Sequence, residues 1–182
     1  MDAAPSRLRT LDLTYIALSA VLITVCAWIS IPAPVPFTLQ TFAVFFALLA
    51  LGGRRGMLAI GTYLMMGAVG LPVFTGFRGG LGVLLGATGG YLVGFVVMAL
   101  VYRLVTRLGG GSLPVGLAGC ILGLVCCYAF GTVWYLTVYA AAGPVGLGRA
   151  LGLCVVPFVI PDLLKLTLAA ALTRRLKKHL HS

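Results

Sequence analysis

Long runs of apolar residues, interrupted by clusters of glycine, proline and basic residues, constrain this chain more than any other feature. Of its 182 residues, 61% are hydrophobic and only 9% are charged, a composition far too apolar for an ordinary soluble domain. A helix needs about 20 mainly apolar residues to cross a bilayer. The sequence therefore predicts an integral membrane protein built from helices.

Six apolar blocks remain when the chain is cut at its charged residues and its Pro and Gly clusters. They cover residues 11–31, 37–51, 56–71, 81–101, 114–142 and 150–173. The second and third blocks are short, but Gly-Gly-Arg-Arg-Gly at 52–56 is a strong turn signal between them. We predict an all-α bundle of six transmembrane helices in a single membrane domain over residues 1–182, with five helices as the main alternative.

The first block follows two arginines and has some features of a secretory signal peptide. Its apolar run is longer than a signal core of about 7–15 residues, and it lacks a clear small-x-small cleavage site. We therefore expect it to remain in the protein as the first helix.

The basic residues are distributed unevenly over the ends of the predicted spans. With the N-terminus in the cytoplasm, ten of the 13 Lys and Arg residues lie on the cytoplasmic side, namely Arg7, Arg9, Arg54, Arg55, Arg103, Arg107, Arg174, Arg175, Lys177 and Lys178. Arg78 and Arg149 lie on the outer side, and Lys165 lies within a span. Cytoplasmic loops of membrane proteins are enriched in Lys and Arg, so both termini of this multi-pass cell-membrane protein are predicted to be cytoplasmic. The basic C-terminal tail is then a topology anchor in contact with lipid rather than a nucleic-acid-binding patch.

Several kinds of enzyme site are missing from the sequence. There is no Gly-rich loop that ends in Lys and Ser or Thr, and both histidines lie among the last four residues, so neither a nucleotide-binding nor a zinc motif is present. The five cysteines lie in apolar blocks without metal-ligand spacing and are interpreted as small buried residues. Only one acidic residue follows position 12, which excludes a carboxylate pair that holds magnesium. We predict that the chain is not an enzyme and uses no metal or other cofactor.

That single acidic residue, Asp162, lies in the apolar segment Ile-Pro-Asp-Leu-Leu-Lys-Leu at 160–166. A charge at the centre of a bilayer costs about 2.5–3.5 kcal/mol on insertion scales, so such residues normally face the bundle interior and are paired. Asp162 and Lys165 are three positions apart and share one face of a helix. The two either only neutralise each other or bind a small polar solute. Pro161 favours the second interpretation because it frees a carbonyl in the preceding turn.

Further polar residues lie in the same outer half of the predicted bundle. The prolines of the segment PAPVP at 32–36 predict a stiff, extended rim or lid. Thr38, Gln40 and Thr41 follow it and either bind a solute or cap the second span. Arg78 either attracts an anionic solute or is a solvated loop charge.

Glycines recur at every fourth position of the fourth block, at Gly82, Gly86, Gly90 and Gly94, with Gly89 beside them. On one helix they form a bare stripe, against which another helix packs closely or a flat ligand lies. We favour helix packing, and the two interpretations are compatible. Tyr91 beside this stripe either lines a pocket or anchors the helix at the membrane interface.

Three longer segments carry a family resemblance. They are PVPFTLQTFAVFFALLALGGRRG at 34–56, GLPVFTGFRGGLGVLLGATGGYLVGF at 70–95 and PDLLK at 161–165. Together they resemble the BioY family, the substrate-binding S components of energy-coupling factor biotin transporters, in order along nearly the whole chain. The resemblance implies a six-helix protein that binds biotin from outside. It also implies partners, a transmembrane coupling subunit and two ATP-binding cassette ATPases, which would hydrolyse ATP in its place.

The same resemblance implies roles for individual residues. Asp162 and Lys165 of PDLLK become biotin contacts, and the segment GATGGY at 86–91 lines the pocket. We hypothesise that Asp162 accepts a ureido N–H, that Lys165 or Arg78 meets a ligand oxygen, and that the flat bicycle lies on the glycines and nearby aromatic rings. The predicted ligand-binding residues are thus Asp162, Lys165, Gln40, Thr41, Arg78, Gly86, Gly89, Gly90 and Tyr91.

In this family, small residues of the first helix dock on the coupling subunit. Here they correspond to Ala17, Ala20, Thr24 and Ala27, among which Ala20 to Thr24 is the one small-xxx-small step. We therefore expect Ala17, Ala20 and Thr24 at the partner interface.

Three other functions stay open from the residues alone. The first is a solo vitamin carrier driven by an ion gradient, with Asp162 as its protonatable group. The second is a membrane enzyme for lipid or prenyl substrates, and the third is a purely structural subunit.

Overall fold

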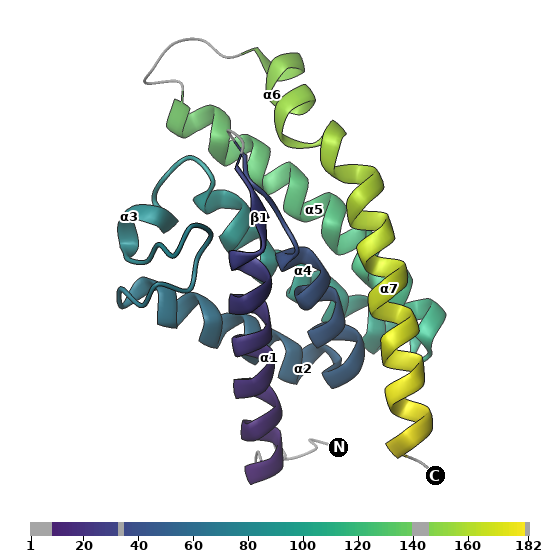
Figure 1. Ribbon diagram of the computed structural model, residues 1–182. Coiled ribbons are helices and arrows are strands. Elements are labelled where there is room, and N and C mark those ends of the chain that lie inside the picture. Colours follow the sequence, from purple (N-terminus) through teal and green to yellow (C-terminus); the bar gives the residue numbers. More distant parts are fainter. Residues whose placement is uncertain (1–8, 33–34, 140–145, 181–182) are drawn as a thin grey trace.

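The computed structural model describes residues 9–32, 35–139 and 146–180, without the side chains of 177–180. Its elements are α1 (Thr10–Trp28), β1 (Ser30–Ile31), β2 (Phe37–Thr38), α2 (Gln40–Ala68), α3 (Leu81–Leu84), α4 (Gly89–Gly109), α5 (Leu113–Tyr139), α6 (Leu147–Cys154) and α7 (Val156–Leu180) (Figure 1). Five helices in this part of the chain are long and apolar enough to cross a membrane. The predicted all-helical membrane protein is confirmed at this level.

Helix α2 covers most of both short predicted spans, 37–51 and 56–71. Gly52 divides it, because its φ of 79° and ψ of 171° are not helical, and glycine adopts such a positive φ at little cost. The turn signal therefore lies where the sequence places it, and the structure has two apolar arms joined at a kink. The count of six separate spans stays a prediction.

The fourth predicted span, 81–101, is wrong as one continuous helix. Helix α3 ends at Leu84 after a single turn, and α4 begins at Gly89. The indole Nε1 of Trp134 in α5 donates a hydrogen bond to the carbonyl of Gly86 in the gap, at 3.0 Å. Glycine has low helix propensity, so the glycine-rich segment opens to accept this tertiary bond, and its glycines do not form one stripe.

The last predicted span, 150–173, is also divided. Helix α6 ends at Cys154, and Val155 has φ −124° and ψ −59° before α7 begins. Pro161 lies inside α7, one residue before Asp162. The break lets α6 cover one side of the bundle while α7 carries Asp162 and Lys165 through its interior.

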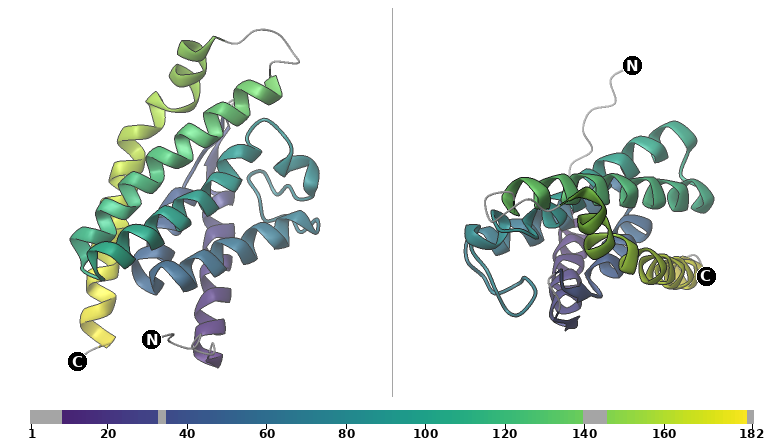
Figure 2. Two further views of the ribbon diagram at one scale, coloured as in Figure 1. Left: turned by 180° about the vertical axis from the view of Figure 1, so that it is seen from behind. Right: turned by 90° about the horizontal axis from the view of Figure 1, so that it is seen from above.

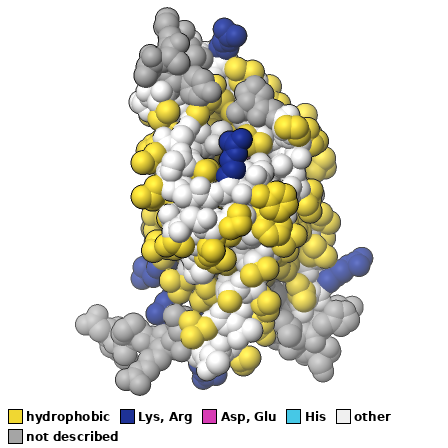
Figure 3. Space-filling view, turned by 60° about the vertical axis from the view of Figure 1, so that its left-hand side comes forward, with side chains coloured by type: hydrophobic (Ala, Val, Ile, Leu, Met, Phe, Trp, Pro, Cys, Tyr) yellow, Lys and Arg dark blue, Asp and Glu magenta, His cyan; other side chains and the backbone are white. Residues whose placement is uncertain are grey.

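The helices pack into one bundle around α2. Helix α4 lies along α5, and α2 contacts α1, α4 and α7 (Figure 2). The interior is filled by large side chains that include Phe45, Leu48, Ile60, Tyr63 and Met98. Hydrophobic side chains also cover much of the outer surface, while Lys and Arg in view gather mainly toward its lower end (Figure 3). This distribution suits a bundle surrounded by lipid, where polar backbone groups are satisfied within helices.

The two ends of the bundle differ. Helix α1 begins and α7 ends at the same end, and the hairpin of β1 and β2 lies toward the other. The hairpin flanks the proline-rich segment, of which residues 33–34 lie outside the described residues. Arg7, the side chains of Lys177 and Lys178, and residues 140–145, which include the end of the fifth predicted span, lie outside them as well.

Candidate functional site

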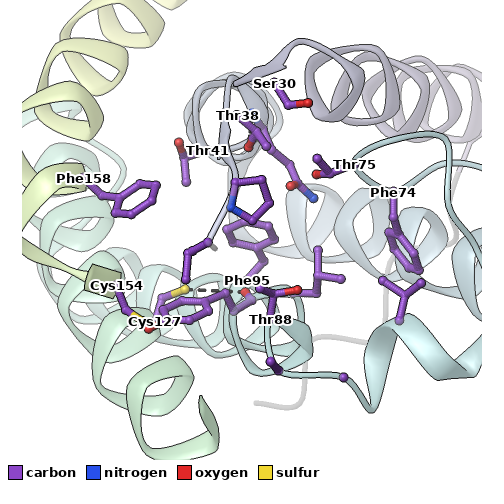
Figure 4. Close-up of a pocket in the computed structure, with 18 of the residues that line it drawn as sticks. Ser30, Thr38, Thr41, Phe74, Thr75, Thr88, Phe95, Cys127, Cys154 and Phe158 are labelled. Atoms are coloured by element: carbon purple, nitrogen blue, oxygen red, sulfur yellow. Dashed lines mark hydrogen bonds between the residues drawn. The ribbon is translucent and has the colours of Figure 1, made fainter. Parts of the chain in front are cut away.

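A cavity of about 530 Å³ lies at the hairpin end of the bundle. Its walls come from the hairpin, the start of α2, the connection between α2 and α3, and helices α4 to α7. Figure 4 shows Phe158 of α7 on one side of this space and Thr75 of the α2–α3 connection on the opposite side. The volume lies within the range of about 300–1,000 Å³ found for small-molecule sites.

An ion pair lies in the wall of this cavity. Lys165 Nζ is 2.7 Å from Asp162 Oδ1, and the two residues are only 7% and 2% exposed. One turn of α7 separates them, so the helix itself places both side chains on the cavity face. The predicted pairing inside the bundle is confirmed.

Residues from three other segments complete the pair. Thr41 Oγ1 donates to Asp162 Oδ1 at 2.8 Å, and Tyr128 OH donates to Asp162 Oδ2 at 2.6 Å. Lys165 Nζ also donates to the Thr38 carbonyl at 2.7 Å and to Thr41 Oγ1 at 3.0 Å. All three ammonium protons therefore have acceptors.

This network leaves a defined capacity for a further hydrogen bond. A carboxylate accepts about four hydrogen bonds over its two oxygens. Oδ1 of Asp162 already accepts from Lys165 and Thr41, whereas Oδ2 accepts from Tyr128. The remaining acceptor site is thus on Oδ2, and Lys165 binds a ligand oxygen only by exchanging one of its present partners.

Aromatic rings lie beside the charged pair. Lys165 Nζ is 4.4 Å from the ring centroid of Phe37, and Phe37 stacks on Phe158 at 5.6 Å. Tyr91 also lines the cavity, and its OH shares a hydrogen bond of 3.1 Å with Thr132 Oγ1. The cavity therefore combines one polar centre with flat apolar walls.

Gln40 and Arg78, two of the predicted ligand-binding residues, also line the cavity. Gln40 Nε2 donates to Tyr63 OH at 2.7 Å, which fixes the amide side chain at the wall. Arg78 is exposed and makes no ion pair with either acidic residue in the described part of the chain, Asp12 or Asp162. It is the second cation of the cavity lining besides Lys165.

The predicted glycines separate into two groups. Gly86 lines the cavity, but Gly89 and Gly90 do not. A Cβ at Gly90 would overlap the Trp134 side chain, and one at Gly89 would overlap the Leu84 carbonyl. These two glycines permit close packing inside the protein, which is the interpretation favoured for the stripe.

The predicted partner-interface residues lie on different faces of α1. Ala17 is exposed, whereas Ala20 and Thr24 are buried in the bundle at 1% and 6% exposure. Thr24 Oγ1 donates to the Ala20 carbonyl at 3.0 Å. In this conformation only Ala17 of the three is open to a partner.

Tyr128 is the site residue that sequence reasoning missed. It lies in the middle of α5, whose residues are almost all apolar. A tyrosine within such a span must find a hydrogen-bond partner for its hydroxyl, which is a signal for an interior polar site. The identity of that partner, 34 positions away in the sequence, is not visible in the pattern.

Known proteins share both the sequence and the fold. The profile of the BioY family matches residues 2–182. A protein of Thermotoga maritima named biotin transporter BioY is 48% identical over 158 residues, which are 86% of this chain and 90% of that protein. A probable biotin transporter BioY of Pyrococcus horikoshii is 37% identical over 93% of this chain and 98% of its own.

A solved structure agrees with these relatives. The crystal structure of an S-component for biotin from an ECF-type ABC transporter matches with a TM-score of 0.83 and 26% identity, over 97% of this chain and 95% of that one. These relatives are transporter components, so the chain is not an enzyme, and its five long apolar helices make it a multi-pass membrane protein. The chain belongs to the BioY family.

Proposed function

We propose that this chain is the membrane-embedded biotin-binding subunit of an energy-coupling factor transporter, which captures biotin at the outer face and delivers it inward. Its relatives carry the name biotin transporter, and the matching solved structure is an S-component for biotin. The observation that carries the proposal is the buried Asp162 carboxylate, which lines a cavity of about 530 Å³ and keeps acceptor capacity on Oδ2.

The chemistry of biotin suits this cavity. Its ureido group has N–H donors, one of which would bind Asp162 Oδ2 beside the Tyr128 hydroxyl. Its flat bicycle would lie among Phe158, Tyr91 and Gly86, which line the cavity. Thr41 and Lys165 would hold the Asp162 carboxylate, and Gln40 would line the pocket. The valerate carboxylate would point toward Arg78, because the ammonium of Lys165 already has three acceptors.

The proposed topology is a single membrane domain over residues 1–182 with six spans and both termini in the cytoplasm. The two arms of α2 then count as separate segments, joined at the Gly52 kink. The unequal number of Lys and Arg residues at the two ends of the spans supports this orientation. The cavity then opens toward the outside.

ATP hydrolysis belongs to partners in this proposal, because the sequence lacks a nucleotide-binding motif. A transmembrane coupling subunit and two ATP-binding cassette ATPases would supply it. Docking through Ala20 and Thr24 would require α1 to shift on α2, because both residues are buried against the bundle. Ala17 is exposed for contact without such a shift.

Isothermal titration of the purified chain tests the ligand. We expect tight, saturable binding of biotin, weaker binding of desthiobiotin, and no binding of unrelated vitamins. Absence of biotin binding by a folded, monodisperse sample would contradict the proposal.

Uptake into proteoliposomes tests the energy source. The chain alone should bind biotin without accumulating it, and addition of the coupling subunit and ATPases with ATP should produce uptake. Accumulation by the chain alone that a protonophore abolishes would instead favour the carrier driven by an ion gradient, with Asp162 as its protonatable group.

A further inference from the structure

The connection between α2 and α3 carries a backbone conformation that its own sequence does not favour. Phe74 N donates to the Arg78 carbonyl at 2.9 Å, which closes a tight turn over Thr75, Gly76 and Phe77. Gly76 and Phe77 both have positive φ, 71° and 56°. Positive φ is ordinary for glycine but a rare outlier for a bulky aromatic residue. Something outside the turn must therefore hold Phe77 in place.

The base of this connection is anchored firmly on α2. Phe74 is 1% exposed and packs edge-on against Tyr63 at 5.5 Å. Its ring lies over Gly67, where a Cβ would overlap it, and Gly80 N donates to the Gly67 carbonyl at 2.7 Å. The base is thus packed and hydrogen-bonded to α2, and the one non-glycine residue with positive φ in the described chain, Phe77, lies at the tip.

Trp28, the last residue of α1, is the contact that reaches the tip. Its ring lies 4.9 Å from the ring of Phe77, and its Nε1 donates to the Pro72 carbonyl at 3.0 Å. Phe77 is 64% exposed, so burial in the core does not explain its conformation. A single indole thus contacts both the start and the tip of the connection.

The conformation of Phe77 decides where the next residue points. Arg78 lines the cavity, and a Cβ built on Gly76 would lie 3.9 Å from Arg78 Nε, so the arginine side chain folds back over the tip. In contrast to Lys165, whose three protons are all engaged, Arg78 makes no ion pair with an acidic residue in the described part of the chain. The polar centre at Asp162 and Lys165 is neutral as a pair, and the additional charge of the cavity is the arginine.

We propose that Trp28 and Phe77 are positioning residues that aim Arg78 at the cavity, where it selects ligands that combine a neutral hydrogen-bonding head with a carboxylate tail. This inference rests on the proposed function, since biotin has that combination of groups. Discrimination between charged and neutral tails then depends on the end of α1 and the tip of the α2–α3 connection, outside the Asp162 network.

The experiment compares biotin with biotinamide, its neutral analogue, by isothermal titration of the full chain. For the wild type, the Kd of biotinamide should exceed that of biotin at least about tenfold, because hydrogen bonds to charged groups are the stronger ones. The ratio of the two Kd values, biotinamide to biotin, should fall toward one in Arg78→Gln. It should also fall at least about threefold in Trp28→Leu and in Phe77→Gly, while the Kd of biotinamide changes less than about twofold. Phe77→Gly permits the same φ without the ring, so it tests the stacking contact even if Trp28→Leu does not fold.

Two further variants separate positioning from anchoring in the membrane. Trp28→Phe keeps a ring against Phe77 and should retain most of the ratio. Tyr15→Leu removes an exposed aromatic residue elsewhere on α1 and should leave the ratio unchanged. An unchanged ratio in Trp28→Leu or Phe77→Gly, with a lower melting temperature, would mean that the aromatic pair only stabilises the fold and would overturn the proposal. Equal affinity of the wild type for both ligands would overturn it too but leave biotin binding intact, whereas failure to bind biotin at all would refute the proposed function.

Discussion

At the scale of single residues, the site depends on one carboxylate with several donors. A buried ion pair is weak evidence for stability, because apolar replacements often serve as well. Asp162 and Lys165 go beyond a simple pair, since Thr41, Tyr128 and the Thr38 carbonyl all bond to them across helices. Removal of one member therefore leaves the others without partners inside the bundle, and an unsatisfied buried charged group is costly.

Asp162→Asn is expected to weaken biotin binding well over tenfold. The amide supplies one oxygen in place of two and carries no charge to hold Lys165, so an acceptor for the ligand is lost. Titration of the purified variant measures the effect. Asp12→Asn is the matched control, because Asp12 pairs with Arg55 at the other end of the bundle. Wild-type affinity in Asp162→Asn would refute the assignment.

The double change Asp162→Leu with Lys165→Met asks whether the pair serves the fold alone. Both side chains become apolar together, so no unpaired charge remains in the bundle. We expect a folded, monodisperse protein that no longer binds biotin, as measured by size-exclusion chromatography and titration. Retained biotin binding would show that the two residues only neutralise each other.

Tyr128→Phe removes the one hydrogen-bond donor to Asp162 Oδ2 among the described residues and keeps the ring. We expect biotin affinity to fall roughly tenfold to 150-fold, which corresponds to the loss of about 1.5–3 kcal/mol for a hydrogen bond to a charged group. Titration against Tyr102→Phe provides the comparison, because Tyr102 is a buried tyrosine of α4 outside the cavity lining. Equal affinities of the two variants would mean that Tyr128 has no part in the site.

At the scale of elements, glycines determine how the helices meet the cavity. The kink at Gly52 divides α2 into two arms, and the gap between α3 and α4 exposes the Gly86 carbonyl to Trp134. Gly90 and Gly94 let α4 approach α5 closely, because Trp134 packs against Gly90 and Cys127 packs against Gly94. Close approach of transmembrane helices at small residues is the usual way in which such bundles gain packing contacts.

Gly90→Ala should destabilise the protein, because the added Cβ overlaps Trp134 Cβ and Cγ and forces α4 and α5 apart. We expect the melting temperature in detergent to fall by several degrees, since overpacking typically costs about 1–3 kcal/mol. Gly61→Ala is the control, because a Cβ there meets no atom within 4 Å and alanine favours the helix. A melting temperature as low in the control would show that the effect is not one of packing.

At the scale of the whole molecule, the two ends of the bundle differ in structure. The cavity and the hairpin lie at one end, while α1 begins and α7 ends at the other. The ion pair of Asp12 with Arg55, at 2.9 Å, joins α1 to the second arm of α2 near that second end. In the proposed topology, the ligand site faces one compartment and most of the basic residues face the other.

Labelling of intact cells tests the orientation. Leu71→Cys, in the connection after α2, should react with a membrane-impermeant maleimide from outside. Gly111→Cys, between α4 and α5, should react only after permeabilisation. The wild type is the control, because four of its five cysteines are buried and Cys126 is half-buried. The reverse pattern of labelling would place both termini outside and contradict the proposed topology.

The membrane class, the apolar segments and the pairing of Asp162 with Lys165 follow from the sequence by itself, because hydropathy and a spacing of three residues are local properties of a helix. The break between α3 and α4 was not predicted, since it depends on a hydrogen bond from Trp134, 48 positions away. Likewise, only the tertiary structure decided that Thr41 and Tyr128, 121 and 34 positions from Asp162, complete its network. Such contacts depend on which helix faces meet after every kink and break. The periodicity of one segment does not predict which face of another segment packs against it.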